Sequence, residues 1–317
     1  NEKDFTLNEL EKSSYASKVF AKNSKIKFID HQNKSKSIEI SEINFLIKDL
    51  NFLNSDFDFE IENLNFKYGK NTKIDSFSGD FVKKDSFINF INSNVNFGES
   101  VFIGELDLDY SKISSSNIAS NNFLNSLKIN LNIIDSKIVS TDLGQLFLSF
   151  ESDYKETWTL KSNINGYINN LNINNWSLTN KKNKIEINCK FVNLFDPNYS
   201  LVFDVLNFDV DSKEINKAFP NFFGTILPSS LRSFGRFKID GLINVSPDDV
   251  KTKFNFQTEQ GLLISDLNIY NFKNIDNASY RGEIIGVDLD LSSFVNLNDI
   301  KKSDFNFKVE GQGFTDR

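Results

Sequence analysis

The chain has few of the residues that build metal centres and nucleophilic active sites. Its 317 residues include one His, one Cys and no Met. A protein-built zinc site takes three or four Cys, His or carboxylate ligands, and a Cys–His nucleophile needs both partners together. His31 lies in a polar loop without an evident partner, and no phosphate-binding Gly loop or nucleophile elbow is present. We therefore expect a protein that is not an enzyme and holds no cofactor and no metal.

A basic surface and long apolar runs are also missing. Lys and Arg number 36 against 43 Asp and Glu, which gives a net charge of −7. A nucleic-acid partner would call for a basic face, so we expect none. The chain contains no stretch of 18 apolar residues that could span a membrane. Because the chain begins without Met, we expect a segment of a longer protein, with any membrane anchor outside it.

What the chain does contain is alternation of polar and apolar residues. A tetrad of Asn or Asp, Leu, Asn or Asp, and a large apolar residue begins at residues 49, 63, 107, 130, 170, 266 and 288. A period of two places one face of a strand on an apolar surface and the other in water. The tetrads therefore predict a mostly β protein with one long, two-faced sheet. At about six residues per strand the chain would hold roughly 20 strands, so the sheet must curl.

Aromatic content is high, but its cause is ambiguous. Phe supplies 33 residues while hydrophobic residues make up only 39% of the chain. With four Arg against 32 Lys, a coding bias explains the Phe count as well as an apolar cavity would. The positions of the Phe residues are more informative, because most fall in the apolar phase of strands. Cys189 continues such a run after Ile185 and Ile187, so we expect it to be a small buried hydrophobe.

Two reversals of parity interrupt the alternation. The apolar phase flips between Ile61 and Leu64, which predicts a bulge or a turn at Glu62–Asn63. A similar flip separates the run that ends at Val205 from the run that begins at Leu206. Residues 7–22 allow either a short helix or a strand.

One region, 212–235, breaks the β pattern and contains Pro220 and Pro228. Ser212 as N-cap before Ile215 predicts a short helix, and 228–232 predicts a second helical turn. The chain thus divides into a β-groove segment at 1–211, a short helical, Pro-containing insertion at 212–235, and a β-groove segment at 236–317 that continues the same sheet. The insertion could plug the groove or cap one end of the sheet. Its candidate residues are Phe222, Phe223, Leu227, Pro228 and Leu231.

Glycines recur in the apolar phase of strands, where side chains are expected to pack. Gly241 follows Phe237 and Ile239, and Gly282 follows Tyr280. Such glycines mark a bend, a bulge or a close approach of another group. They could let the strands bend in a curled sheet, or they could widen an apolar groove for a ligand.

The segment 222–314 resembles the TamB branch of the AsmA-like superfamily, in the form seen in Bacteroidetes-type bacteria. The resemblance rests on Phe223-Gly224, Leu227-Pro228-Ser229-Ser230-Leu231, Gly235-Arg236-Phe237-Lys238-Ile239-Asp240-Gly241, Gly261 with Ser265-Asp266-Leu267, Asn277-Ala278-Ser279-Tyr280-Arg281-Gly282, and Val309-Glu310-Gly311-Gln312-Gly313-Phe314-Thr315. Weaker similarity occurs at 77–81 and 135–140. At 233–235 the chain has Ser-Phe-Gly where the family favours Leu-Gly.

The resemblance implies a periplasmic segment of a long protein anchored in the inner membrane. Members of the family resemble extended β-grooves, or tacos, with apolar interiors that carry phospholipid between the inner and outer membranes. They are also linked to the assembly and secretion of outer-membrane β-barrel proteins through a BamA-like partner.

Three hypotheses follow. The chain is a phospholipid-conducting groove, an assembly factor that pairs through open β edges, or a plain structural β domain with a filled interior. For the first we expect phospholipid acyl chains to contact a groove lined by Phe237, Ile239, Gly241, Ile243, Tyr280, Gly282, Ile284, Phe305, Phe307 and Val309.

Overall fold

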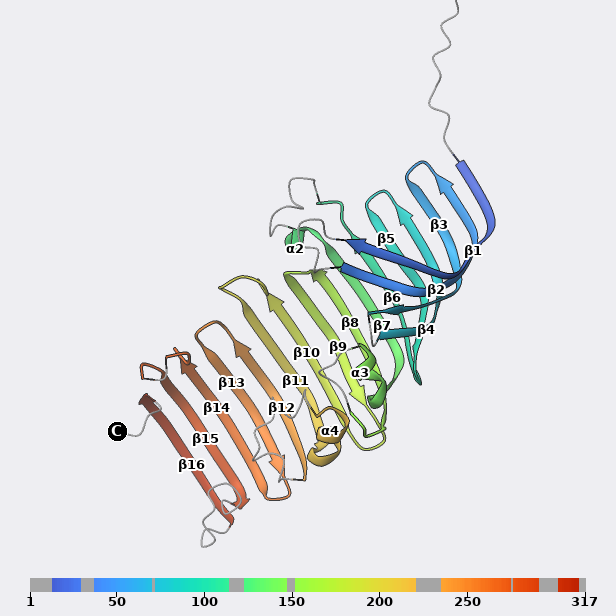
Figure 1. Cartoon of the computed structure of the whole chain (residues 1–317). Coiled ribbons are helices and arrows are strands. Elements are labelled where there is room, and N and C mark those ends of the chain that lie inside the picture. The colour runs from blue at the N-terminus through green and yellow to red at the C-terminus, as the bar shows by residue number, and fades with distance from the viewer. Residues whose placement is uncertain are drawn as a thin grey trace, which may run out of the picture.

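A computed structural model describes residues 13–29, 37–69, 72–113, 123–146, 152–220, 235–274, 276–290 and 302–313. Over these residues the chain forms one sheet of sixteen strands, each paired with the strand before it and the strand after it in sequence. All of these pairs run antiparallel. Figure 1 shows one elongated, curled and twisted layer with β1 and β16 at its two ends. The prediction of a mostly β, elongated antiparallel sheet with a short helical insertion is confirmed.

The strands are β1 (Ser13–Ile29), β2 (Ser37–Leu53), β3 (Asp56–Tyr68), β4 (Thr72–Lys84), β5 (Phe87–Phe97), β6 (Ser100–Asp109), β7 (Lys128–Val139), β8 (Thr157–Tyr167), β9 (Asn170–Thr179), β10 (Lys184–Val192), β11 (Ser200–Asp211), β12 (Arg236–Val245), β13 (Val250–Thr258), β14 (Gly261–Tyr270), β15 (Ser279–Asp290) and β16 (Lys302–Gln312). The described helices are α2 (Phe123–Ser126), η1 (Ser140–Asp142), α3 (Leu143–Leu146) and α4 (Ser212–Ala218). The expected strand number was too high, because the strands contain 9 to 17 residues instead of about six. The described part of segment 7–22 is strand.

The register of the sheet aligns apolar residues in rows that cross several strands. One row runs from Gly241 on β12 through Phe254, Ser265 and Ile284 to Phe307 on β16. Residues that pair directly in antiparallel strands project from the same face. The alternation found in each strand therefore adds up to one apolar face that crosses the whole sheet.

The opposite face carries the polar residues of the tetrads. Asn89 Nδ2 donates to Asp107 Oδ1 at 2.6 Å, and Asn130 Nδ2 donates to Asp107 Oδ2 at 3.1 Å. These two bonds join β5, β6 and β7 on the outer surface. The short polar residues of the tetrads thus form cross-strand ladders that add to the backbone pairing.

Bulges near the middle of many strands interrupt the ladder. Asp135 on β7 and Asn175 on β9 have φ of +43° and +52°, and the register shifts at both residues. Both reversals of parity coincide with bulges, in which Glu62 and Leu206 are the extra residues of their strands. Because a bulge bends its strand, successive bulges crease the sheet across the strands. This line of bulges, with Gly104 and Gly241 on neighbouring strands, divides the apolar face into two zones.

Candidate functional site: an apolar face in two zones

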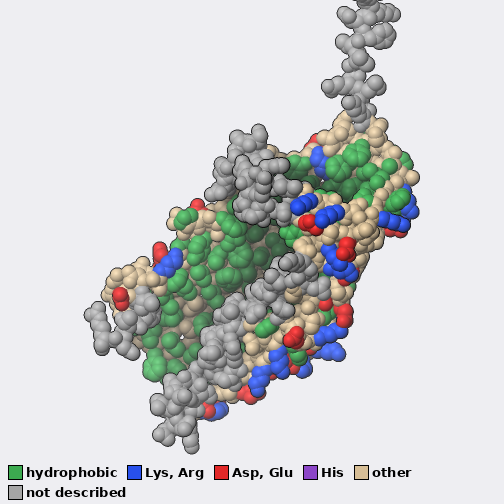
Figure 2. Space-filling model, viewed as in Figure 1, with side chains coloured by type: hydrophobic (Ala, Val, Ile, Leu, Met, Phe, Trp, Pro, Cys, Tyr) green, Lys and Arg blue, Asp and Glu red, His purple; other side chains and the backbone are tan. Residues whose placement is uncertain are grey.

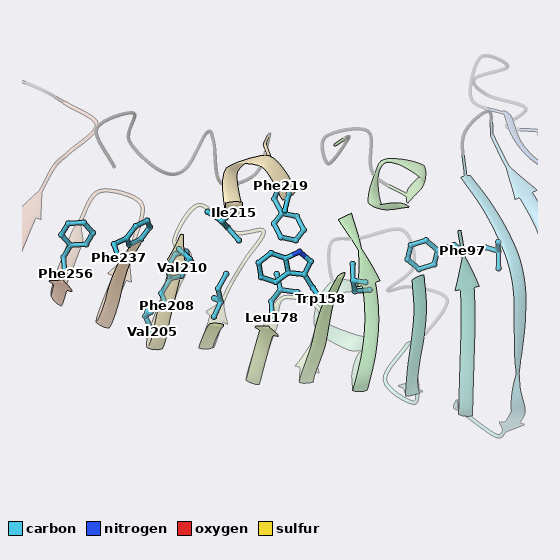
Figure 3. Close-up of a cluster of buried hydrophobic side chains, with 14 residues drawn as sticks. Phe97, Trp158, Leu178, Val205, Phe208, Val210, Ile215, Phe219, Phe237 and Phe256 are labelled. Atoms are coloured by element: carbon cyan, nitrogen blue, oxygen red, sulfur yellow. The ribbon is translucent and has the colours of Figure 1, made fainter. Parts of the chain in front are cut away.

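The first zone is covered by a short helix and belongs to the protein core. It comprises Trp158, Leu178, Ile185, Phe208, Val210 and Phe237 on the sheet, and Ile215, Ala218 and Phe219 at α4. Ile215 and Ala218 are fully buried, and the ring centroids of Phe219 and Trp158 are 5.2 Å apart. Figure 3 shows Ile215 and Phe219 above Trp158 and the strands below it. We call this the roofed zone.

Polar contacts fix α4 over the roofed zone. The Asp211 carboxylate accepts hydrogen bonds from the backbone N–H groups of residues 213 and 214, so Asp211 is the N-cap and the expectation of Ser212 was wrong. Ser212 occupies the first helical position instead and is buried. At the other end of the helix, Ser152 Oγ donates to the Lys217 carbonyl at 2.6 Å. Asn183 Nδ2 donates to Glu214 Oε2 at 3.2 Å.

The second zone lies across the line of bulges and stays partly exposed. Its members share the apolar phase with the roofed residues but have no described helix over them. They include Leu131, Ile164, Ile173, Phe191, Phe203, Ile243 and Leu267, all intermediate in exposure. Figure 2 shows hydrophobic side chains over a broad, hollowed surface, with charged side chains mainly along its margins. We call this the open zone.

A hollow of about 260 Å³ lies on the apolar face of β4 to β7. It is lined by Phe77, Phe90, Ser93, Val95, Phe102, Gly104, Glu105, Leu106 and Leu131. The Ser93 hydroxyl is buried and has no hydrogen-bond partner among the described residues. The lining of this open hollow is mostly apolar, so it suits an apolar occupant better than a polar one.

The glycines of the apolar phase allow the strands to bend and pack closely, and they do not widen a groove. A Cβ on Gly241 would lie 2.2 Å from the Lys253 carbonyl oxygen, and one on Gly282 would lie 2.1 Å from the Asp266 carbonyl oxygen. The backbone of the neighbouring strand already occupies the space of the missing side chain. Gly241 also has a φ of +140°.

Two further glycines of this sheet are covered by aromatic rings from the paired strand. Phe305 lies over Gly286, and Tyr280 lies over Gly311, so that each ring is within 2.5 Å of where a glycine Cβ would be. Aromatic residues paired with glycine in this way pin the register of edge strands.

The predicted groove residues all lie on the apolar face, in two groups. Four of them, Phe237, Ile239, Gly241 and Ile243, are on β12, and the other six are on β15 and β16, with β13 and β14 between. The pairs Gly282–Val309 and Ile284–Phe307 join β15 to β16. Phe237 is 1% exposed, which places it in the roofed zone and out of reach of a ligand in this conformation.

The residues proposed as a plug or cap, Phe222, Phe223, Leu227, Pro228 and Leu231, lie outside the described residues. So does the second helical turn expected at 228–232. The described part of the insertion, 212–220, contributes α4 to the roofed zone.

Sequence reasoning missed the apolar residues of the two strands between the predicted groups. Phe254 on β13 and Leu267 on β14 stand in the same rows as Gly241 and Gly282. The tetrad at 266–269 marks Leu267 directly, and the alternation of Phe254 with Phe256 was also available as a signal.

Cys189 is an ionisable residue within the open zone. Cys189 projects from β10 between Ile173 and Phe203 and is free. Burial among apolar side chains raises the pKa of its thiol to about 11. The described residues contain no cluster of three or more His, Cys, Asp or Glu that could hold a metal ion. No helix in the described ranges has the length and hydropathy needed to cross a bilayer.

Comparison of the chain with protein-family models, with curated proteins and with solved structures found no match. The geometry of the apolar face and the resemblance described from the sequence are what bear on function.

Proposed function

We propose that the chain is a section of a periplasmic bridge that carries phospholipid between the inner and outer membranes and so maintains the outer membrane. The observation that carries this proposal is the open zone, a partly exposed apolar surface that continues from strand to strand. The resemblance to the TamB branch supports a periplasmic location and an inner-membrane anchor in the parent protein.

The physical chemistry of the open zone suits acyl chains. Each CH₂ group removed from water recovers about 0.8 kcal/mol, so a lipid with two long chains crosses water slowly without a carrier. An apolar strip of near-equal sites lets the chains slide without a deep trap. The polar headgroup can stay in water because no described helix covers this zone.

The length of the sheet fits a section of a bridge. Sixteen strands spaced about 4.8 Å apart extend over roughly 70 Å along the sheet. That distance exceeds the roughly 30 Å hydrocarbon core of one bilayer. A lipid that moves along the strand-to-strand direction would therefore travel more than twice the thickness of one hydrocarbon core.

Two neighbouring residues offer a matched test. Ile284 belongs to the apolar row that ends at Phe307, whereas Ile285 projects from the opposite face beside Ile264. Ile284→Asp should abolish co-purification of phospholipid, measured by native mass spectrometry, and should slow lipid transfer between vesicles. Ile285→Asp introduces the same charge one residue away and should leave both unchanged. Purified wild-type chain without phospholipid and without transfer activity would contradict the proposal.

A second candidate function is the assembly of outer-membrane β-barrel or autotransporter proteins by pairing with a BamA-like partner. The observation in its favour is that β1 and β16 each pair on one side only among the described strands. An open edge can accept a client strand by β-augmentation. Proline within 305–309 should then abolish partner binding while lipid loading persists.

A further inference from the structure

A hollow of about 750 Å³ crosses β7 to β11 on the polar side of the sheet. Its floor includes Asn132, Asn163 and Asn174, which pair in a row over β7, β8 and β9. Residues that pair directly project from one face, and Asn132 is a polar residue of a tetrad, so this row faces away from the open zone. We call this site the outer hollow. It is separate from the surface proposed for lipid.

An exposed aliphatic side chain stands at each end of the outer hollow. Ile134 on β7 is 42% exposed and Leu206 on β11 is 51% exposed. The pairing of the strands from β7 to β11 places these two residues at one level of the sheet. Four strand spacings of about 4.8 Å put them roughly 19 Å apart. The outer hollow thus has two apolar ends and a polar floor.

The charges in the outer hollow are balanced. Lys161 Nζ lies 2.6 Å from Asp135 Oδ1, and Glu186 Oε1 lies 3.0 Å from Lys184 Nζ on the same strand. The Asn174 side chain is exposed, and an Asn amide offers both hydrogen-bond donors and an acceptor. An extended peptide chain exposes one donor and one acceptor per residue, whereas a helix bonds most of these groups internally. The floor therefore complements an uncharged, extended backbone.

We propose that the outer hollow binds an extended polypeptide segment that lies across the strands and carries apolar residues at positions i and i+6. An extended chain rises about 3.3 Å per residue, so six residues span roughly 20 Å, close to the separation of Ile134 and Leu206. The even spacing places both apolar residues on the same side of the segment. Such a segment has the pattern of a strand with one apolar face. This inference does not depend on lipid transport.

A saccharide fits the outer hollow less well. Sugar rings stack on exposed aromatic faces, but the exposed apolar residues at the two ends are aliphatic. Trp176 also contributes to the lining, yet it pairs with Ile187 and packs against the buried core on the opposite face of the sheet.

The test titrates the whole chain into a fluorescently labelled peptide of about nine residues, with leucines at i and i+6 and uncharged polar residues elsewhere. Fluorescence polarisation should show saturable binding. A peptide of the same composition with leucines at i and i+5 projects them to opposite sides and should bind about tenfold more weakly. Leu206→Asp and Ile134→Asp should each weaken binding about tenfold or more, because each sets a carboxylate against an apolar side chain.

Leu242→Asp is the matched control. Leu242 is 40% exposed and pairs with Asp204 on the same outer face, but it lies outside the outer hollow. This variant should bind the peptide as the wild type does. The comparison of the two peptides uses the wild-type chain, so it decides the proposal even where a variant fails to fold.

Four results would each overturn the proposal. They are the absence of saturable binding, equal binding of the two peptides, equal weakening by Leu242→Asp, and displacement of the peptide by a neutral oligosaccharide of N-acetylglucosamine.

Discussion

The roofed and open zones are made from the same strands, and β11 contains both. Phe208 is 8% exposed and its ring stacks with Phe237 at 5.8 Å. Phe203, five residues earlier on the same apolar face, is intermediate in exposure and packs edge-on against Phe191 at 6.0 Å. The bulge at Leu206 lies between them. Alternation thus decides which face a residue joins, while the position of α4 decides whether that residue becomes core or accessible surface.

The crease that separates the zones should be the most sensitive place in the sheet. Gly241→Ala would force a Cβ to within 2.2 Å of the Lys253 carbonyl oxygen, in a backbone with φ of +140°. We expect the free energy of unfolding to fall by about 4 kcal/mol or more, or the chain not to fold. Urea unfolding followed by circular dichroism measures this loss.

The matched control is Gly69→Ala in a turn. Gly69 also has positive φ, at +62°, but nothing lies within 4 Å of its Cβ position. Only backbone strain of about 1–2 kcal/mol remains there. Equal losses in both variants would mean that close packing across the crease contributes nothing.

The comparison of the two phenylalanines on β11 can be tested by the same truncation. Phe208→Ala removes a ring from the roofed zone and should cost about 3–5 kcal/mol. Phe203→Ala removes a ring that water already reaches, so the loss should be about half as large. Both values come from urea unfolding, with the slope of each transition checked for equality. A larger loss for Phe203 would show that the open zone is core in solution.

The sequence predicted the face of the sheet well because a period of two is a local signal. Parity reversals located the bulges at Glu62 and Leu206, since an extra residue leaves a mark in the alternation itself. Other bulges were missed, although Asp135 and Asn175 belong to the residue types that tolerate positive φ. The strands of the described residues also run well past six residues, with or without bulges, so sixteen long strands stand there instead of about twenty short ones.

The division into zones could not be predicted from alternation. It depends on where α4 lies, and that position is fixed by contacts such as those of Glu214 with Asn183 and of the Lys217 carbonyl with Ser152. These partners are 31 and 65 residues apart in sequence. Phe237 and Ile243 therefore share one sequence pattern, but Phe237 is buried in the roofed zone and Ile243 is partly exposed in the open zone.

A substitution at Asp211, the N-cap of α4, should destabilise only the roofed zone, and by less than the substitutions above. Asp211→Ala removes the acceptor for the backbone N–H groups of Lys213 and Glu214 and should cost about 1 kcal/mol. Because the substitution lies beside the roofed zone, hydrogen exchange should accelerate at 212–219 and leave the amides of β13 to β15 unchanged. Asp211→Asn keeps a capping oxygen and should restore most of the protection. Uniformly faster exchange would show that the roof and the sheet open together.

Cysteine reactivity should distinguish the two zones. The reactive species is the thiolate, and burial raises the pKa of Cys189 from 9.0 to about 11. At pH 8 its reaction with a maleimide should therefore be about a hundredfold slower than in the urea-unfolded chain. The raised pKa of the folded state also means that stability is lost as pH rises from about 9 through 11. Cys189→Ala should remove that alkaline loss.

A second thiol in the roofed zone completes the comparison. Val210→Cys, made in the Cys189→Ala background, places a thiol at a fully buried position of β11. It should react more slowly than Cys189, because α4 must open before the reagent can enter. Phospholipid vesicles should slow Cys189 further if acyl chains occupy the open zone, and they should leave Val210→Cys unaffected. Equal protection of both thiols would mean that lipid acts on the whole fold, whereas protection of Cys189 alone places the acyl chains on the open side of the crease.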